Sequence, residues 1–416
     1  MAMGHREFIF IIALLMAMVA LTTDAMLPAL SRMALDFGVN GNAIQLVVTS
    51  VFVGHALGQL VYGPVSDTYG RKRSIFVGLG IFCLGSLISV WAESLEMMLA
   101  GRFLQGFGAS GPRVMVVALV RDCFSGAAMA RIMSFAMTLF MAVPIMAPLV
   151  GQGILLVGPW QWIFGFYVVF ATVMFAWVYF RLDETLKPEN RLSLHPKRLW
   201  HTMVRVLVNP IATGYSFVAG LVLGAFMGYL SSSLQIFQQV YGVGEAFPFY
   251  FGVLAVPTIV ASLLNAKLVI RFGMYALVQV TNVMTGVACV VFYLYAQSLE
   301  SGPSLGEFMA LCSIIFFGVG FRFGNLNALA MEPLGKLAGM GASVVGSCST
   351  LVSVPIGMWV GMSFDGTVLP LVLGFAVTSW AAFVAMLFLN KPPKPLSKVW
   401  CWTPKAGFFA TAEYAR

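Results

Sequence analysis

Apolar runs of about twenty residues recur along the whole chain, separated by shorter polar stretches. A helix of about twenty apolar residues crosses the hydrocarbon core of a bilayer, which is about 30 Å thick. The pattern therefore predicts twelve membrane spans. They cover residues 8–29, 43–63, 74–92, 97–119, 132–157, 162–180, 210–230, 248–267, 276–296, 308–330, 341–362 and 368–389.

The longest polar stretch divides these spans into six and six. We expect an N-terminal bundle over residues 1–180, a cytoplasmic linker over 181–209, a C-terminal bundle over 210–389 and a basic cytoplasmic tail over 390–416. The linker should contain a short amphipathic helix lying on the anionic inner leaflet. The predicted fold class is an all-α polytopic membrane protein of two pseudo-symmetric six-helix bundles.

Composition and charge agree with a membrane protein. Of the 416 residues 60% are hydrophobic and 10% are charged, against about 25% charged residues in average soluble domains. The net charge of +8 does not indicate a nucleic-acid partner, because the basic residues follow the spans. Twenty of the 24 Lys and Arg residues fall on the side of the N-terminus, and only Arg32 falls in a loop on the other side. By the positive-inside rule, both termini are expected in the cytoplasm.

The second half repeats the first weakly. Two motifs recur: Ile270-Arg-Phe-Gly273 stands in place of Asp67-Thr-Tyr-Gly70, and Gly318-Val-Gly320 in place of Gly106-Phe-Gly108. In this alignment Arg322 falls opposite Ser110, one turn from Arg113. Internal symmetry of this kind is typical of transporters built from two parallel halves.

Ionisable residues inside the spans are few and costly in hydrocarbon, so they should face protein or water. Asp24 is the one acid among them, and Pro28 then ends or kinks its helix. Arg102 and Arg113 lie eleven residues apart, about three turns, so they project from one face of the fourth span. We expect Asp24 to carry a proton and Arg102 to influence its titration. The alternative is a helix-end acid wetted by the outer headgroups.

Between the second and third spans lies GPVSDTYGRKR, from Gly63 to Arg73. Its Pro, Ser and Gly residues predict a tight turn, and its three adjacent bases indicate the cytoplasmic side. Asp67 can accept hydrogen bonds from backbone N–H groups or from the start of another helix, where the dipole favours an anion. A solvated loop acid is the alternative.

This spacing resembles the signature between the second and third helices of the major facilitator superfamily. Arg102-x-x-Gln-Gly-x-Gly is similar to that superfamily's second signature. The resemblance implies that the loop residues latch the two halves together on the cytoplasmic side. These latch residues are Gly63, Asp67, Gly70, Arg71 and Arg73.

Further motifs resemble the drug:proton antiporters, in particular the Bcr/CflA drug-resistance subfamily. The run from Asp24 to Leu30, Asp-x-x-Leu-Pro-Ala-Leu, is similar to their first helix. The fifth span holds Pro144, Pro148 and Gly151 in a run similar to the antiporter signature Gly-Pro-x-x-Gly-Gly. Helix packing alone is the alternative interpretation of that run, because the pattern is degenerate.

Several polar residues inside the spans are candidates for substrate binding. They are Arg113, Arg322, Gln59, Asn325, Asn327, His55 and Gln235. The two arginines could face one cavity from opposite halves and clamp a carboxylate or phosphate. Alternatively, each arginine binds helix-end carbonyls or reaches the inner headgroups, and His55 makes only an interhelical hydrogen bond.

No G-x-S-x-G, H-E-x-x-H or P-loop motif is present, so we expect neither an enzyme nor a cofactor. The six cysteines form no C-x-x-C pair and indicate packing rather than a metal site. Uphill transport would then need an ion gradient. The resemblance favours proton-coupled export of small amphipathic molecules, and the intramembrane arginines Arg113 and Arg322 favour anionic groups on them. An uptake carrier for an organic anion and a receptor or scaffold without transport are the alternatives.

The expected partners are the small-molecule substrate, protons and membrane lipids. Nucleic acid is not expected, and the protein should work as a monomer. The expected location is the inner membrane of a bacterial cell, with multiple passes.

Overall fold

The computed structural model describes residues 4–39, 41–124, 132, 143, 146–186, 189, 191 and 196–389. Within these ranges all regular structure is helical, and eleven helices are long and apolar enough to cross a membrane. A shorter apolar helix, Met146–Val157, covers the second half of the predicted fifth span. Apart from residues 132 and 143, the rest of that span and the tail lie outside the described residues. The prediction of an all-α multi-pass membrane protein is confirmed.

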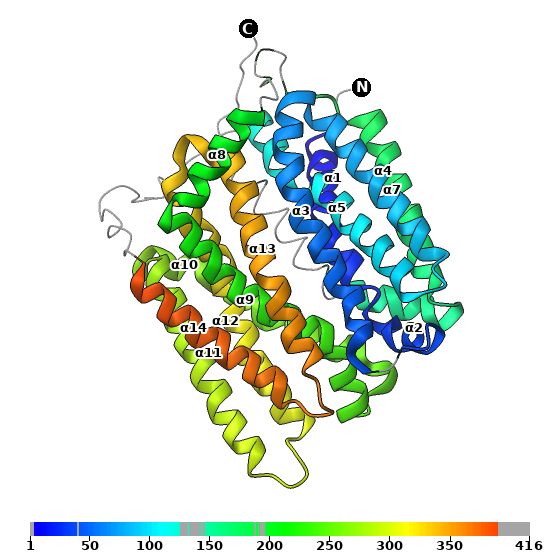
Figure 1. Cartoon of the computed structure of the whole chain (residues 1–416), viewed down its shortest axis with the longest axis vertical. Coiled ribbons are helices and arrows are strands. Elements are labelled where there is room, and N and C mark those ends of the chain that lie inside the picture. Colours follow the sequence, from blue (N-terminus) through cyan, green and yellow to red (C-terminus); the bar gives the residue numbers. More distant parts are fainter. Residues whose placement is uncertain are drawn as a thin grey trace, which may run out of the picture.

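Two groups of helices lie side by side (Figure 1). The N-terminal group contains α1 (His5–Asp24), α2 (Leu30–Asp36), α3 (Leu46–Tyr69), α4 (Arg71–Val90), α5 (Leu95–Cys123) and α7 (Gln161–Arg181). The C-terminal group contains α9 (Pro210–Gln235), α10 (Phe247–Phe272), α11 (Met274–Gln297), α12 (Leu305–Met331), α13 (Ala338–Met362) and α14 (Leu369–Phe388). Along the sequence, α8 (Pro196–Val208) lies between the two groups and inside the predicted linker.

The two groups meet along α3 and α13, which are adjacent in the middle of the molecule (Figure 1). Midway along this seam, Ser347 of α13 donates a hydrogen bond to the carbonyl of Ala56 at 2.9 Å. We call the end of the molecule that holds Arg71 and α8 the basic end, and the other the opposite end. Gly63 of α3 packs against Ser343 of α13 toward the basic end.

The first span is broken where the sequence predicts a kink. α1 ends at Asp24, and Pro28 lies in a 3₁₀ turn, Leu27–Ala29, that leads into α2. Proline has no backbone N–H to continue a helix. The break leaves the carbonyls at the end of α1 available to side chains of other helices.

The predicted turn over Gly63 to Arg73 is wrong in extent. α3 continues to Tyr69, and the reversal before α4 is confined to Gly70, whose φ of 106° suits glycine. Within α3, Ser66 and Thr68 return hydrogen bonds to carbonyls three and four residues earlier. Pro64 has no N–H to donate to the carbonyl of Leu60, and the helix continues past it without that bond. Gly273, between α10 and α11, has a φ of 79° and supports the proposed repeat.

Small residues set the distance between neighbouring helices, as is usual in membranes. Gly220, Gly224 and Gly228 form a stripe on α9 that faces β-branched side chains of α13. A Cβ added at Gly224 would lie 2.6 Å from the Cβ of Ile356. The close packing of α9 on α13 therefore depends on this stripe.

Replacing Gly224 by valine should force α9 and α13 apart. Overpacking a tight interior costs about 1–3 kcal/mol, so we expect the melting temperature in detergent to fall by several degrees. The matched control is Gly80→Val in α4, where nothing lies within 4 Å of an added Cβ. An equal fall in both variants would contradict the dependence of this packing on the glycine stripe.

Candidate functional site

Asp24 is the last residue of α1, and its side chain is buried, with 5% exposed. Among the described residues no donor hydrogen-bonds its carboxylate, and no basic side chain forms an ion pair with it. A buried carboxylate without partners is costly when ionised, whereas the neutral acid is much less so. This position therefore suits a group that gains and loses a proton.

Arg102 does not pair with Asp24 but holds the end of its helix. Both terminal nitrogens donate to the carbonyl of Thr22 at 3.2 Å, and Nε donates to the carbonyl of Val47 at 3.3 Å. The guanidinium also donates to the side-chain oxygen of Gln105 at 2.7 Å. It thus sits at the negative end of the α1 dipole, where a cation is favoured. The arginine fixes the place of Asp24 without neutralising it.

Two further residues, Tyr167 and Gly151, pack around the end of α1. Tyr167 of α7 donates its hydroxyl to the carbonyl of Thr22 at 3.1 Å. Gly151 packs on the backbone of Ala25, so close that a side chain there would overlap its carbonyl oxygen. The buried Pro148 precedes it by one turn, whereas Pro144 lies outside the described residues. Part of the proposed antiporter run therefore abuts the residue that follows Asp24.

From the C-terminal group, Tyr229 of α9 is close enough to Asp24 for an electrostatic interaction between the two side chains. The ring of Tyr229 is fixed between Phe251 and Phe316, with centroids 5.7 and 4.9 Å away. Its buried hydroxyl has no hydrogen-bond partner within the described part of the chain. Two unpartnered polar groups, one from each group of helices, thus lie near each other.

At the basic end, Arg71 is the centre of a charged cluster. Its guanidinium donates to Asp67 at 2.6 Å, to Ser66 at 2.7 Å and to Asp122 of α5 at 3.1 Å. The carboxylate of Glu184 accepts the backbone N–H of Arg71 at 2.9 Å and that of the next residue at 3.2 Å. An anion at the start of α4 is favoured by the helix dipole. The cluster joins the ends of α3, α4, α5 and α7.

The predicted latch residues occupy different places around this cluster. Asp67 bonds to Arg71 on the next helix, Gly70 lies against the carboxylate of Glu184, and Arg73 is exposed. Of the five, Gly63 is in contact with the other group of helices, through Ser343. The latch across the two halves stays a prediction.

Arg113 and His55 form the polar centre of the N-terminal group. Arg113 is exposed and His55 is buried, and the guanidinium lies 3.4 Å from Nε2 of the imidazole. Because a guanidinium can only donate, Nε2 must accept and the ring proton must be on Nδ1. Gln59, one turn further along α3, lies against Gly346 of α13 at the seam.

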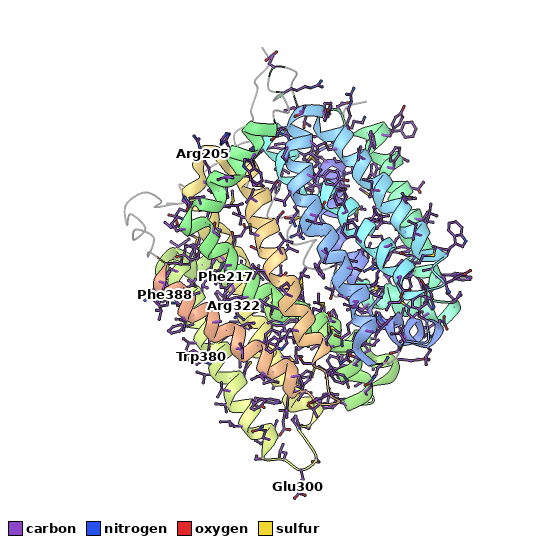
Figure 2. All side chains as sticks on the ribbon, viewed as in Figure 1. Arg205, Phe217, Glu300, Arg322, Trp380 and Phe388 are labelled. Carbon is purple, nitrogen blue, oxygen red and sulfur yellow. The ribbon has the colours of Figure 1, made fainter. Side chains whose placement is uncertain are left out.

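Arg322 is buried, 1% exposed, inside the C-terminal group (Figure 2). It donates to the carbonyl of Gly318 at 3.1 Å, to Thr285 at 3.2 Å, and to Asn282 and Ser379 at 3.3 Å. These partners belong to α11, α12 and α14. The guanidinium is therefore directed into its own bundle, and the structure does not bring Arg322 and Arg113 together.

The reason is a shift in the expected repeat. Gly106 packs on α3, and the glycine of α12 that packs in the same way on α10 is Gly320 rather than Gly318. Arg322 therefore takes the place of Gly108, which packs on α4, and faces α11. The alignment that put it one turn from Arg113 is wrong by two residues, which is enough to turn a helical side chain to another face.

The two asparagines of α12 differ from each other. Asn325 is buried and exchanges two hydrogen bonds with Asn265 of α10, at 2.8 and 3.3 Å. Asn327 is exposed, at the position that corresponds to Arg113 in the corrected repeat. Asn325 thus braces two helices, whereas Asn327 is free to meet a ligand.

A family model described as Major Facilitator Superfamily matches residues 12–357. The chain belongs to this superfamily. The predicted membership is confirmed, and the protein is accordingly a transporter and not an enzyme. The solved structure of a D-xylose-proton symporter superposes on this superfamily member with a TM-score of 0.70 at 13% identity. The match covers 92% of this chain and 97% of that one, and it shows the shared fold.

Curated relatives of this superfamily member include two resistance proteins. A bicyclomycin resistance protein homolog of Haemophilus influenzae is 29% identical over 92% of this chain and 96% of its own length. Multidrug resistance protein D of Escherichia coli is 26% identical over 83% of this chain and 86% of its own length. The similarity to these proteins spans nearly the whole transporter.

Sequence reasoning missed several residues of this transporter's site. Asp122 and Glu184 lie just after predicted spans, where an acid is normally solvated. Nothing in the sequence marks them as hydrogen-bond partners of Arg71. Tyr167 and Tyr229 lie in apolar runs that indicate a packing surface. Their roles depend on contacts between helices far apart in sequence.

Gln235 lies in a bridge between the two groups at the opposite end rather than beside the other candidates. It accepts a hydrogen bond from Gln45 and donates to Asn42 at 3.2 Å. Asn42 in turn donates to the carbonyls of Met362 and Phe364, at 2.8 and 2.9 Å, where α13 ends. This amide bridge, formed by Asn42, Gln45 and Gln235, must break if the transporter opens at the opposite end.

Replacing Gln235 by leucine should favour opening at the opposite end. A net hydrogen bond contributes about 1 kcal/mol, so the loss of two should raise the ratio of open to closed protein about thirtyfold. The readout is the labelling rate of a cysteine at Thr49 in a chain whose native cysteines are replaced by alanine.

Gln297→Leu is the matched control. This glutamine lies in the last turn of α11, and among the described residues its amide donates a hydrogen bond to Tyr293 of the same helix and to no other group. We expect its labelling rate to equal that of the parent. Unchanged labelling in Gln235→Leu would show that the bridge does not hold the end closed.

Proposed function

We propose that this protein is a proton-coupled exporter of small amphipathic molecules, working by substrate:proton antiport in the inner membrane of a bacterial cell. The observation that carries the proposal is the burial of Asp24 without an ion pair or hydrogen bond among the described residues. The names of the relatives, bicyclomycin resistance and multidrug resistance, support efflux. Without a nucleotide-binding motif, a proton gradient is a suitable source of energy.

Asp24 is the proton carrier in this proposal. Arg102 and Tyr167 fix the end of α1 through the Thr22 carbonyl, so protonation changes the charge of Asp24 but not its place. An ionised Asp24 would attract the hydroxyl of Tyr229, and a neutral one would attract it less. Because Tyr229 belongs to the other group of helices, the charge of Asp24 biases how closely the two groups approach.

The halves then move as two bundles, residues 1–180 and 210–389, around a site between them. The amide bridge holds the opposite end, and the stretch from Gly63 to Arg73 controls the basic end. A latch of this kind changes the populations of the two open states and leaves intrinsic affinity unchanged. Both termini are proposed to be cytoplasmic, from the distribution of basic residues.

Arg113 supports a substrate with an anionic group. It is exposed and lies against the neutral His55, so its charge is not compensated by any described acid. A guanidinium offers a planar pair of donors to a carboxylate or phosphate. Asn327, at the corresponding position of α12, is the proposed second contact. Arg322 is not part of this proposal, because its donors are used inside its own bundle.

The ligand must first be identified. Purified protein should be screened by ligand-induced thermal shift against antibiotics, bicyclomycin included, carboxylate metabolites and siderophores. Transport of a hit in proteoliposomes with an imposed pH gradient then gives the direction. Movement against the proton supports antiport. Movement with the proton favours the uptake carrier, and a bound ligand that never moves favours a receptor.

Asp24→Asn should abolish transport driven by a pH gradient but retain exchange of labelled for unlabelled substrate. The amide keeps the shape of the protonated acid and cannot release a proton. Asp36→Asn is the matched control, since this acid of α2 accepts the indole N–H of Trp160 at 2.6 Å at the same end. Full pH-driven transport by Asp24→Asn would exclude Asp24 as the carrier.

Arg113→Gln should weaken binding of an anionic ligand about tenfold or more, because a hydrogen bond to a charged group contributes about 1.5–3 kcal/mol. A neutral analogue of that ligand should lose much less. Arg322→Gln, the matched control, should lower the melting temperature and leave the affinity of the folded fraction unchanged. Equal affinity of Arg113→Gln and parent for the anion would refute the proposed contact.

A further inference from the structure

The helix α8 is held at the membrane edge by its connection to α9. It ends at Val208, and the membrane helix α9 begins two residues later at Pro210. Asn209 caps α9 by accepting the backbone N–H groups of Ile211 and Ala212 at 3.1 and 3.0 Å. Because this cap joins the two helices without a loop, α8 lies beside the bilayer surface at the basic end.

One face of α8 is packed against the protein. Val206 is buried, and Met203 is partly buried beside it, in a hydrophobic cluster with Tyr215 of α9 and Val344 of α13. Leu60 of α3, from the other group of helices, packs against the same cluster. The inner face of α8 therefore packs into a cluster that extends to the seam between the two groups.

The other face of α8 exposes large apolar side chains. Trp200 is 61% exposed, Leu207 40% and Val208 73%. His201 and Arg205 are exposed between them, and Figure 2 shows Arg205 at the outer edge of the C-terminal group. Residues 196–209 contain three basic residues and no acid. This combination of an exposed tryptophan, aliphatic side chains and positive charge is typical of a helix in the headgroup layer.

We propose that the exposed face of α8 is a binding surface for anionic phospholipid headgroups. The apolar side chains enter the boundary of the acyl chains, and the basic residues attract the negative surface of the leaflet. The surface is separate from the substrate site and does not depend on which molecule is carried. Because the inner face of α8 packs into the cluster that also holds Val344 of α13 and contacts Leu60 of α3, lipid bound outside biases the contact between the halves.

The test uses the full chain in lipid nanodiscs, with native cysteines replaced by alanine and a nitroxide attached at His201→Cys. One sample contains phosphatidylcholine alone, and in the other roughly one third of it is replaced by phosphatidylglycerol. The readout is the accessibility of the nitroxide to a water-soluble nickel reagent. We expect phosphatidylglycerol to lower this accessibility about threefold. High salt should reverse this protection, because it screens the attraction. Equal accessibility in the two lipids would overturn the proposal.

The variant Lys197→Gln/Arg198→Gln/Arg205→Gln should lose the response to phosphatidylglycerol. The matched control removes three bases of the C-terminal half outside α8, as Lys267→Gln/Arg271→Gln/Lys336→Gln, and should keep it. If both triple variants responded as the parent does, the basic residues of α8 would not bind the lipid. The salt experiment on the parent chain tests the proposal even if a triple variant does not fold.

Discussion

Hydrocarbon offers no partners to a charged side chain, so each charge inside this bundle must find them within the protein. Arg102 and Arg322 do so with neutral groups: carbonyls at the ends or turns of helices, hydroxyls and amides. Asp24 does not, as far as the structure describes the chain. The arrangement stabilises two permanently charged guanidinium groups. It leaves one carboxyl group, that of Asp24, which can be either ionised or neutral. The proposed transport cycle depends on that difference.

The two ends of the molecule are built differently. At the basic end, charged residues are joined by ion pairs and by a carboxylate at a helix start. At the opposite end the two groups of helices are joined by neutral amides and by carbonyls at the end of α13. Each hydrogen bond between neutral amides contributes a modest free energy, so such a bridge can break and re-form in every cycle.

Much of the fold followed from the sequence, because membrane spans are defined by length and hydrophobicity. The kink after Asp24 and the reversal at Gly273 were also predictable, since proline and glycine restrict or permit the backbone locally. The extent of the turn after Gly63 was not, because α3 continues through Pro64 to Tyr69. A proline inside a span does not by itself show where the helix ends.

The candidate site was less predictable. Asp24 and Arg102 stand out as charges in apolar runs, but their relation, a shared helix end instead of an ion pair, depends on how α1 meets α5. The orientation of Arg322 depends on a repeat offset that becomes visible only where Gly106 and Gly320 touch their neighbours. The interaction of Tyr229 with Asp24 becomes visible only in the folded chain, because the two residues belong to different groups of helices. Such facts concern the packing of distant segments, which no single stretch encodes.

The proposed transport cycle requires that the carboxyl group of Asp24 loses its proton when substrate binds. Infrared difference spectroscopy of the protein in nanodiscs, with ligand added at constant pH, measures this directly. We expect loss of the carbonyl stretch of one protonated carboxyl group in the parent and in Asp36→Asn, and no such loss in Asp24→Asn. An unchanged carboxyl band in the parent, or the same loss in Asp24→Asn, would contradict the proposed role of Asp24.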